Sequence, residues 1–245
     1  YLLNDKTPFD VTEGFRNLKA ALSVSVPKKS HGVSIMATSA YPEDGKTTVT
    51  VNLALMFAVS NAKVVLVDAD IRKGRVAKYF KRKSTPGLSD YLSGQNTLEE
   101  VIHQSHINEN LSYLTCGTHS PKPYELLESN EMKALIAELR TRYDYVIIDS
   151  VPAMAVADAV VIDSLVDLTL YVIRDGNLDR NQLPDIERLH KEKRIHNMGV
   201  VFNGVKQSKH GYGYGYGYGY GYYSDEELSP TKMRIKRFLS LFKKH

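Results

Sequence analysis

Short apolar runs rich in valine and isoleucine recur along this chain, and helical patterns separate most of them. Strands buried on both faces of a sheet read as continuous apolar runs, and parallel strands need long, usually helical, connections. The runs therefore predict an α/β fold, with a doubly wound and mainly parallel sheet that carries helices on both faces. The expected strands are residues 33–39, 63–70, 111–116, 143–150, 168–173 and 198–205.

The spacing of apolar residues between these runs predicts the helices. Residues 12–22 place Phe15, Leu18 and Leu22 on one side of an amphipathic helix and charged residues on the other. The other expected helices are residues 47–60, 124–142 and 179–193.

Composition and charge exclude several classes of protein. The single cysteine, Cys116, excludes an intrachain disulfide framework, and we expect it to be a small reduced residue. The formal net charge of +4 is too small to argue for nucleic-acid binding. No apolar run approaches the roughly 18 residues that cross a bilayer, so the chain is cytosolic in type. Because it begins at Tyr1 rather than methionine, we expect a missing upstream segment, which could include a membrane anchor.

The first expected strand leads into a phosphate-binding loop. Ala40 precedes four residues and then Gly45, Lys46 and Thr47, which matches the pattern GxxxxGK[ST] except at its first glycine. In such a loop, backbone N–H groups at a helix start surround phosphate oxygens, the lysine reaches the β and γ oxygens and the threonine hydroxyl holds Mg²⁺. The residues expected around the nucleotide are Ala40, Asp44, Gly45, Lys46, Thr47 and Thr48.

Two later strands end in aspartates, in the runs VVLVDADIRKG and YDYVIIDSVPA. The carboxyl ends of neighbouring parallel strands meet at one edge of a sheet, so Asp68, Asp70 and Asp149 are expected beside the phosphate loop. Three carboxylates so close together repel each other unless a cation neutralises them, and Mg²⁺ prefers such oxygen ligands. The alternative is that these aspartates only cap the helices that follow the strands.

Taken together, these motifs resemble the bacterial tyrosine kinases of capsule and exopolysaccharide export, which share a P-loop NTPase fold with MinD and ParA proteins. The resemblance rests on AYPEDGKTT, DADIRKG, IIDSVP, EGFRNLK and a terminal tyrosine cluster, and it covers nearly the whole chain. It implies ATP and Mg²⁺ as cofactors, with Lys46 and Thr47 in the loop. It also implies that Asp68 is the base that takes the tyrosine proton. Thr47, Asp70 and Asp149 are then the residues that hold the metal, Asp149 through bound water.

The resemblance also assigns residues outside the loop. Glu13, Arg16 and Lys19 fall on the family's subunit-contact motif ExxRxxR, where lysine in place of the last arginine loses bidentate geometry. Asn203 is similar to an asparagine that contacts the nucleotide base, and it could equally form a turn. Arg72 either contacts phosphate or pairs with a carboxylate, and the second role is favoured.

The family resemblance further implies partners and a location. It implies a homo-oligomeric ring, an octamer by resemblance, and a transmembrane chain-length regulator that is either fused or separate. It also implies a protein-tyrosine phosphatase and a place at the cytoplasmic face of the cell membrane. No nucleic-acid partner is expected. The expected segments are 1–30 with the subunit-contact helix, the kinase domain 31–209, a Gly/Tyr-rich tail 210–224 and a C-terminal helix 225–245.

The tail alternates glycine with tyrosine. Glycine at every second position raises the entropy lost on ordering, so we expect a flexible segment rather than a strand. A merely adhesive tail is one interpretation, and a substrate tether for a neighbouring subunit's active site is the other. Several phosphotyrosines, each with a charge of about −1.5 to −2, would make docked tails leave and disperse a ring. The expected phosphoacceptors are Tyr212, Tyr214, Tyr216, Tyr218, Tyr220, Tyr222 and Tyr223.

A basic amphipathic helix is expected after the tyrosines. Ile235, Phe238, Leu239 and Phe242 follow i, i+3, i+4, i+7 spacing, with basic residues on the remaining faces. Such a helix suits an anionic membrane surface or a groove on a partner, or it packs back on its own domain.

Two other functions stay open on the sequence alone. A partition or cell-division switch ATPase has the same broad fold, but Tyr41 occupies the place of its signature lysine. The other is a non-catalytic nucleotide-binding adaptor of a transport complex. Release of phosphate without labelled protein would indicate the ATPase, and binding without either product would indicate the adaptor.

Overall fold

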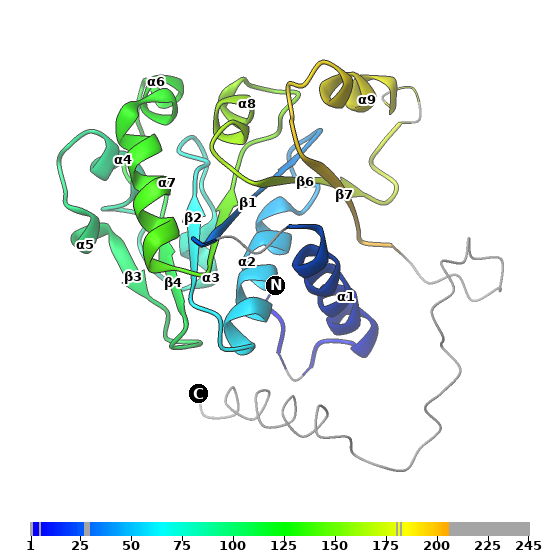
Figure 1. Cartoon of the computed structure of the whole chain (residues 1–245), viewed down its shortest axis with the longest axis horizontal. Helices are drawn as coiled ribbons and strands as arrows, with labels where there is room; N and C mark the ends of the chain where they lie inside the picture. Colours follow the sequence, from blue (N-terminus) through cyan, green and yellow to red (C-terminus); the bar gives the residue numbers. More distant parts are fainter. Residues whose placement is uncertain (1, 5, 27–29, 180, 182, 206–245) are drawn as a thin grey trace, which may run out of the picture.

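The computed structural model describes residues 2–4, 6–26, 30–179, 181 and 183–205 of the chain's 245. Within these ranges seven strands form one sheet in the order β3-β4-β2-β5-β1-β6-β7, and all neighbours are parallel except β3 and β4 (Figure 1). The strands are β1 (Val33–Ser39), β2 (Val64–Asp68), β3 (Ile102–Gln104), β4 (Leu111–Leu114), β5 (Tyr145–Asp149), β6 (Leu168–Arg174) and β7 (Met198–Asn203). The predictions for the tyrosine tail and the basic C-terminal helix lie outside the described residues.

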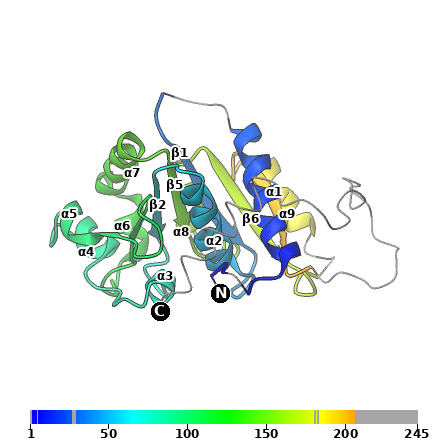
Figure 2. The same ribbon diagram turned by 90° about the horizontal axis from the view of Figure 1, so that it is seen from below.

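Helices cover both faces of this sheet, as Figures 1 and 2 show from two directions. One face packs against α1 (Phe9–Ser25), α2 (Lys46–Val59) and α3 (Val76–Tyr79). The other face packs against α4 (Leu88–Leu92), α5 (Leu98–Val101), α6 (Pro123–Glu128), α7 (Asn130–Arg142), α8 (Asp158–Asp163) and α9 (Leu183–Lys191). The predicted doubly wound α/β fold is therefore confirmed.

Successive side chains of each strand point to opposite faces of the sheet, so the core has two halves. In β2, Val64 and Leu66 join the core on the side of α2, whereas Val65 and Val67 join the core on the side of α7. Both halves are excluded from water, which is why the expected strands read as unbroken apolar runs rather than alternating ones. This packing fixes the carboxyl ends of β1, β2 and β5 side by side.

One predicted helix is wrong in detail. The sequence suggested a single helix over residues 124–142, but the structure has α6 and α7, which are separated at Ser129. Ser129 has extended backbone dihedrals, and its hydroxyl accepts a hydrogen bond from the Met132 N–H at 3.2 Å. A serine that satisfies a free N–H at a helix start stabilises a new start more than a continuation. The antiparallel strand β3 was not predicted, because three residues give too short a periodic signal.

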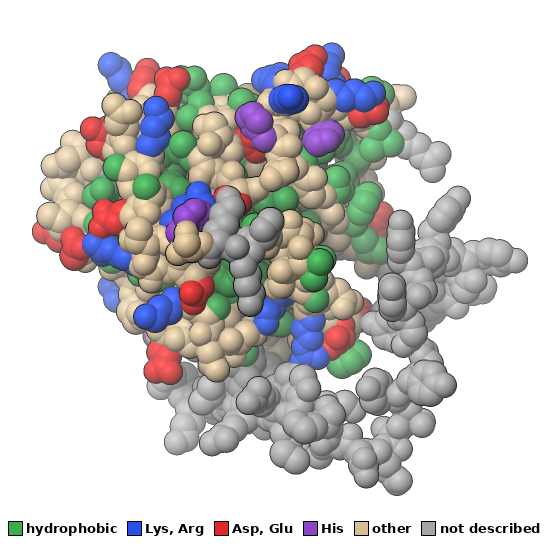
Figure 3. Space-filling view, viewed as in Figure 1, with side chains coloured by type: hydrophobic (Ala, Val, Ile, Leu, Met, Phe, Trp, Pro, Cys, Tyr) green, Lys and Arg blue, Asp and Glu red, His purple; other side chains and the backbone are tan. Residues whose placement is uncertain are grey.

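The described surface carries charge of both signs. On α9, basic and acidic side chains lie next to each other (Figure 3), and ion pairs join Arg188 to Asp185 and Lys191 to Glu187. In the described part of the chain, no helix combines the length and the apolar character that crossing a membrane requires.

Candidate active site

The phosphate loop joins β1 to α2. Gly45 stands at the helix start with φ of 93°, in the left-handed region, where a side chain would be strained. A Cβ on Gly45 would also lie 2.0 Å from Nδ2 of Asn203. The Lys46 ammonium is buried and donates to Ser39 Oγ at 3.1 Å. Glycine is therefore required here both by the backbone conformation and by the close approach of β7.

Asp44 is the centre of a set of hydrogen bonds that fixes this loop. Its carboxylate accepts from the Tyr41 N–H at 3.0 Å and from Asn177 Nδ2 at 3.3 Å. Its backbone carbonyl accepts from Asn203 Nδ2 at 2.9 Å. Arg174, the last residue of β6, adds a bond to the Glu43 carbonyl at 3.0 Å. Groups from the ends of β6 and β7 thus hold the loop in place from outside.

Asp68 and Asp149 end neighbouring strands and face each other in register. Both side chains are buried, and one oxygen of each, Oδ1, has no hydrogen-bond partner. The other oxygen of Asp68 accepts from the Val76 N–H at 3.0 Å. Buried polar atoms are rarely left without a partner. These two oxygens therefore indicate a place where a donor or a cation binds.

Burial controls the titration of these groups. It raises the pKa of Asp68 well above its usual range, and the nearby charge of Asp149 raises it further. Burial also raises the pKa of Asp149 to about 7, opposed by hydrogen bonding from Thr47 and by the Lys46 charge. In the opposite sense, burial lowers the pKa of Lys46, while Asp149 and Asp44 raise it. Each carboxyl is thus poised to keep its negative charge only when positive charge is close.

Asp70 lies two residues beyond β2, and its Oδ1 accepts from the Lys73 N–H at 2.9 Å. Its charge acts on Asp68, Asp149 and Lys46, so the structure brings the predicted aspartates together at the loop. Among the described residues no group of three or more His, Cys, Asp or Glu side chains has metal-binding geometry. The oxygens without partners and the excess of negative charge nevertheless fit a divalent cation, whose other ligands would be nucleotide oxygens.

Other predicted residues divide into two groups. Arg72 forms an ion pair with Asp158, with bonds of 2.9 and 3.2 Å, and this agrees with the favoured structural role. Thr48 lies beside the loop, and its hydroxyl is 2.9 Å from the Tyr79 hydroxyl. Ala40 is buried just after β1. Asn203 contacts the loop through Asp44, a contact that the prediction of a base-binding residue did not include.

The predicted subunit-contact residues lie on α1 and are not part of the loop. Glu13 and Arg16 form an ion pair within the helix. Lys19 Nζ donates to Ser60 Oγ and lies 6.0 Å from the centre of the Phe57 ring on α2. Within the described subunit Lys19 therefore joins α1 to α2, and a role of the three residues between subunits remains a prediction.

Sequence reasoning missed Ser39, Arg174 and Asn177. Ser39 could have been found, because it is the last residue of the strand before the loop. Arg174 and Asn177 follow no motif, and only the pairing of β6 with β1 brings them to the loop.

Comparison with known proteins agrees with this geometry. The AAA domain family matches residues 44–172. The chain is 39% identical over 177 residues to tyrosine-protein kinase YwqD of Bacillus subtilis. This match covers 72% of this chain and 74% of that protein. It is 38% identical over 205 residues to a putative tyrosine-protein kinase in the cps region of Klebsiella pneumoniae, covering 83% of this chain. The match spans only 28% of that relative's length.

Solved structures give the same result. The kinase domain of the Escherichia coli tyrosine kinase ETK has a TM-score of 0.73 and 34% identity, and the match covers 83% of this chain and 80% of that one. The septum site-determining protein MinD of Pyrococcus horikoshii, solved with Mg-ADP, has a TM-score of 0.57 at 22% identity and shares the fold alone. With its phosphate loop, its paired aspartates and these relatives, the chain belongs to the bacterial tyrosine-protein kinases.

Proposed function

We propose that this chain is an ATP-dependent protein-tyrosine autokinase that phosphorylates its own C-terminal tyrosine cluster in trans. The observation that supports this best is the pair of buried oxygens without partners on Asp68 and Asp149, beside the phosphate loop with its buried lysine. A carboxyl whose pKa is raised is a better proton acceptor, and tyrosine has a pKa of about 10, so it needs such an acceptor to react at neutral pH.

The chain's residues have distinct roles in this proposal. The loop amides and Lys46 bind the phosphates of ATP, and Thr47, Asp70 and Asp149 would hold Mg²⁺. When bound, Mg²⁺ supplies positive charge that offsets the charge of the phosphate oxygens. The hydrogen bonds that Asp44 receives from Tyr41, Asn177 and Asn203, here called the Asp44 clamp, keep the loop amides in position. Little reorganisation is then needed during transfer.

Asp68 is the base in the transfer step. The tyrosine oxygen forms a bond to the γ-phosphorus while the bond from that phosphorus to the bridging β,γ oxygen breaks. The phenolic proton passes to Asp68 Oδ1, and ADP leaves with the bridging oxygen. Lys46 stabilises the charge that develops on the transferred group.

The substrate and its regulatory effect are proposed from the sequence. Tyr212 to Tyr223 alternate with glycine, and such slim neighbours suit entry into an active site of another subunit. Unphosphorylated subunits would form a ring through α1, and phosphorylation would disperse it by adding charge to the tails. The resemblance supplies the ring, the regulation of exopolysaccharide polymerisation and export, the phosphatase, the transmembrane regulator and the place at the inner membrane face.

The first test is the intact mass of the purified full chain after incubation with Mg-ATP. We expect stepwise additions of phosphoryl groups that map to Tyr212 through Tyr223. Lys46→Met should abolish them because phosphate contact is lost, and Asp68→Asn should abolish them because an amide accepts no proton at neutral pH. Circular dichroism shows whether each variant is folded, and ATP binding should persist in Asp68→Asn.

Each other outcome contradicts the proposal in a specific way. Release of phosphate without a change of protein mass would indicate a switch ATPase. Binding of ATP without either product would indicate a nucleotide-binding adaptor. Full phosphorylation of folded Asp68→Asn would show that another group takes the proton.

A further inference from the structure

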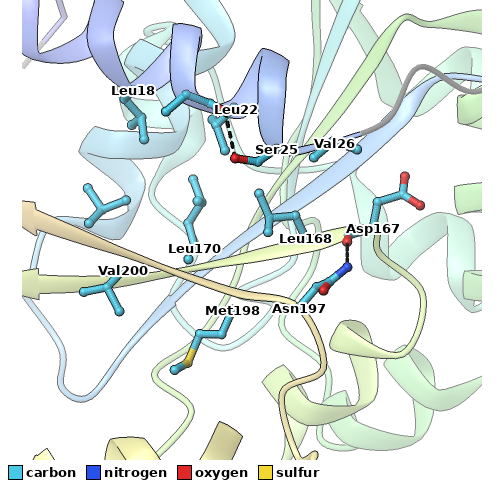
Figure 4. Close-up of a pocket in the computed structure, with 13 residues that line it drawn as sticks. Leu18, Leu22, Ser25, Val26, Asp167, Leu168, Leu170, Asn197, Met198 and Val200 are labelled. Atoms are coloured by element: carbon cyan, nitrogen blue, oxygen red, sulfur yellow. Dashed lines mark hydrogen bonds between the residues drawn. The ribbon is translucent and has the colours of Figure 1, made fainter.

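A pocket of about 550 Å³ lies between α1 and the strands β6 and β7, lined mostly by apolar residues together with Ser25, Asp167 and Asn197. Leu18 and Leu22 of α1 face Leu168 and Leu170 of β6 across it (Figure 4). Met198 and Val200 of β7 also line it. The pocket includes the first residues of both strands, whereas the phosphate loop follows the carboxyl end of β1. An occupant of the pocket therefore leaves the loop accessible.

Apolar side chains outside the pocket are also exposed on α1 and near the end of β7. Val24, near the end of α1, is 87% exposed, and Phe202 on β7 is 66% exposed. Val205, just beyond β7, is also exposed. Within the described residues β7 is the last strand of the sheet on this side, and no further strand pairs with it. A pocket lined by leucines beside an unpaired sheet edge indicates a surface that another segment covers.

The chain itself provides an occupant of suitable length. Residues 206–245 are separated by two residues from the end of β7, the strand that forms one wall of the pocket. About 30 residues separate Val205 from Ile235, and they reach up to about 100 Å when extended. Their average end-to-end distance as a Gly-rich linker would be roughly 30 Å. The length of β7 is about 20 Å, so the distal segment can return to the pocket.

The chemistry of the distal segment also fits. Ile235, Phe238, Leu239 and Phe242 share one side of the expected helix. A cavity of roughly 150 Å³ binds benzene, so a pocket of 550 Å³ can take both phenylalanine rings. The basic residues on the other side of the helix would stay in water.

We propose that residues 232–244 of this chain bind with their apolar side in the pocket between α1, β6 and β7 of the same subunit. The tyrosine cluster is then held at both ends, by β7 and by the docked helix, and forms a closed loop. Release of the helix would open this loop and lengthen the reach of the tyrosines. The proposal does not depend on kinase activity.

The test measures how fast a thiol at the pocket is labelled in the full chain. Ser25→Cys places this thiol at the exposed end of α1, at the pocket, and buried Cys116 gives the background. Three tails are compared in proteins that carry Ser25→Cys: the parent tail, the double variant Phe238→Asp/Phe242→Asp, and the control Ser240→Asp. Ser240 lies on the opposite side of the expected helix. None of these tail substitutions touches the described core.

We expect about tenfold faster maleimide labelling in the double aspartate variant, because an effective tail concentration on the order of 1 mM keeps a weak site occupied. Ser240→Asp should label at the parent rate, and the rates should not change with protein concentration. Equal rates in all three proteins would overturn the proposal. Slow labelling of the parent only at high protein concentration would show docking of a second copy's tail instead. Binding of the parent to anionic vesicles, with no effect of the double variant on labelling, would identify a membrane helix.

Discussion

Asp44 shows how one side chain in the loop determines the geometry of the others. Its carboxylate and carbonyl together receive bonds from Tyr41, Asn177 and Asn203, so three separate segments of the chain meet at one residue. A loop that must present its amides to phosphate gains from being fixed before the nucleotide binds, because less ordering then opposes binding. We therefore expect the residues that bond to Asp44 to affect nucleotide affinity through the position of the loop.

Asn203→Ala tests this clamp. Loss of one hydrogen bond is worth about 0.5–1.5 kcal/mol, so we expect two- to tenfold weaker ATP binding by titration calorimetry. Asn17→Ala, on the exposed side of α1, is the control and should bind ATP like the parent. Unchanged affinity in folded Asn203→Ala would mean that the clamp does not organise the loop.

Cys116 gives a second prediction at this scale. Burial, together with the charges of Asp68 and Asp70, raises the pKa of this thiol to about 12. At pH 8 the thiolate fraction is then on the order of one in ten thousand, and the thiolate is the reactive form. Ellman's reagent should therefore detect almost no thiol in the folded chain and one thiol in denaturant. Fast reaction of the folded chain would place Cys116 at the surface.

At the scale of elements, the parallel pairing of β2 with β5 is what places Asp68 opposite Asp149. The sequence predicted that these two aspartates lie close together, because both end apolar runs and the carboxyl ends of parallel strands lie at one edge of a sheet. It did not predict the contributions of β6 and β7, because Asn177 and Arg174 lie in or beside a turn whose position depends on the whole sheet. It also missed the break at Ser129, since the apolar spacing of residues 124–142 is compatible with one helix.

Ser129→Ala tests the break between α6 and α7. Removing the hydroxyl leaves the Met132 N–H without its acceptor, so the free energy of unfolding should fall by about 1 kcal/mol. Ser129→Asp keeps an acceptor at the same position and should restore most of the loss. Urea unfolding followed by circular dichroism measures both variants. Equal loss in both would show that the cap does not stabilise α7.

At the scale of the whole molecule, α1 both packs against the helix of the phosphate loop and lines the pocket beside β6 and β7. Its inner side packs on α2, the helix that begins in the phosphate loop, and Lys19 contacts Ser60 at the end of that helix. Another part of α1 forms the pocket with β6 and β7. If α1 also forms the proposed contact between subunits, its packing on the loop helix would link subunit assembly to the nucleotide site.

The proposed dispersal of the ring can be tested on the assembled protein. Changing all the tyrosines from Tyr212 to Tyr223 to phenylalanine removes the acceptors but keeps the aromatic rings. Light scattering after addition of Mg-ATP should show a fall in mass for the parent and none for this variant. Equal dispersal of both would mean that nucleotide binding, rather than tail phosphorylation, separates the subunits.

The bond from Asn203 to Asp44 joins residues that are 159 positions apart. During synthesis, residue 44 leaves the ribosome long before residue 203 does. The loop therefore lacks the supporting hydrogen bond from Asn203 until nearly the whole domain has been synthesised. Contacts between distant positions also slow folding. Because Tyr212, the first tyrosine of the tail, lies only nine positions after Asn203, the tyrosines emerge shortly after that support becomes available. The order of the chain thus makes completion of the nucleotide loop coincide with the appearance of its proposed substrate.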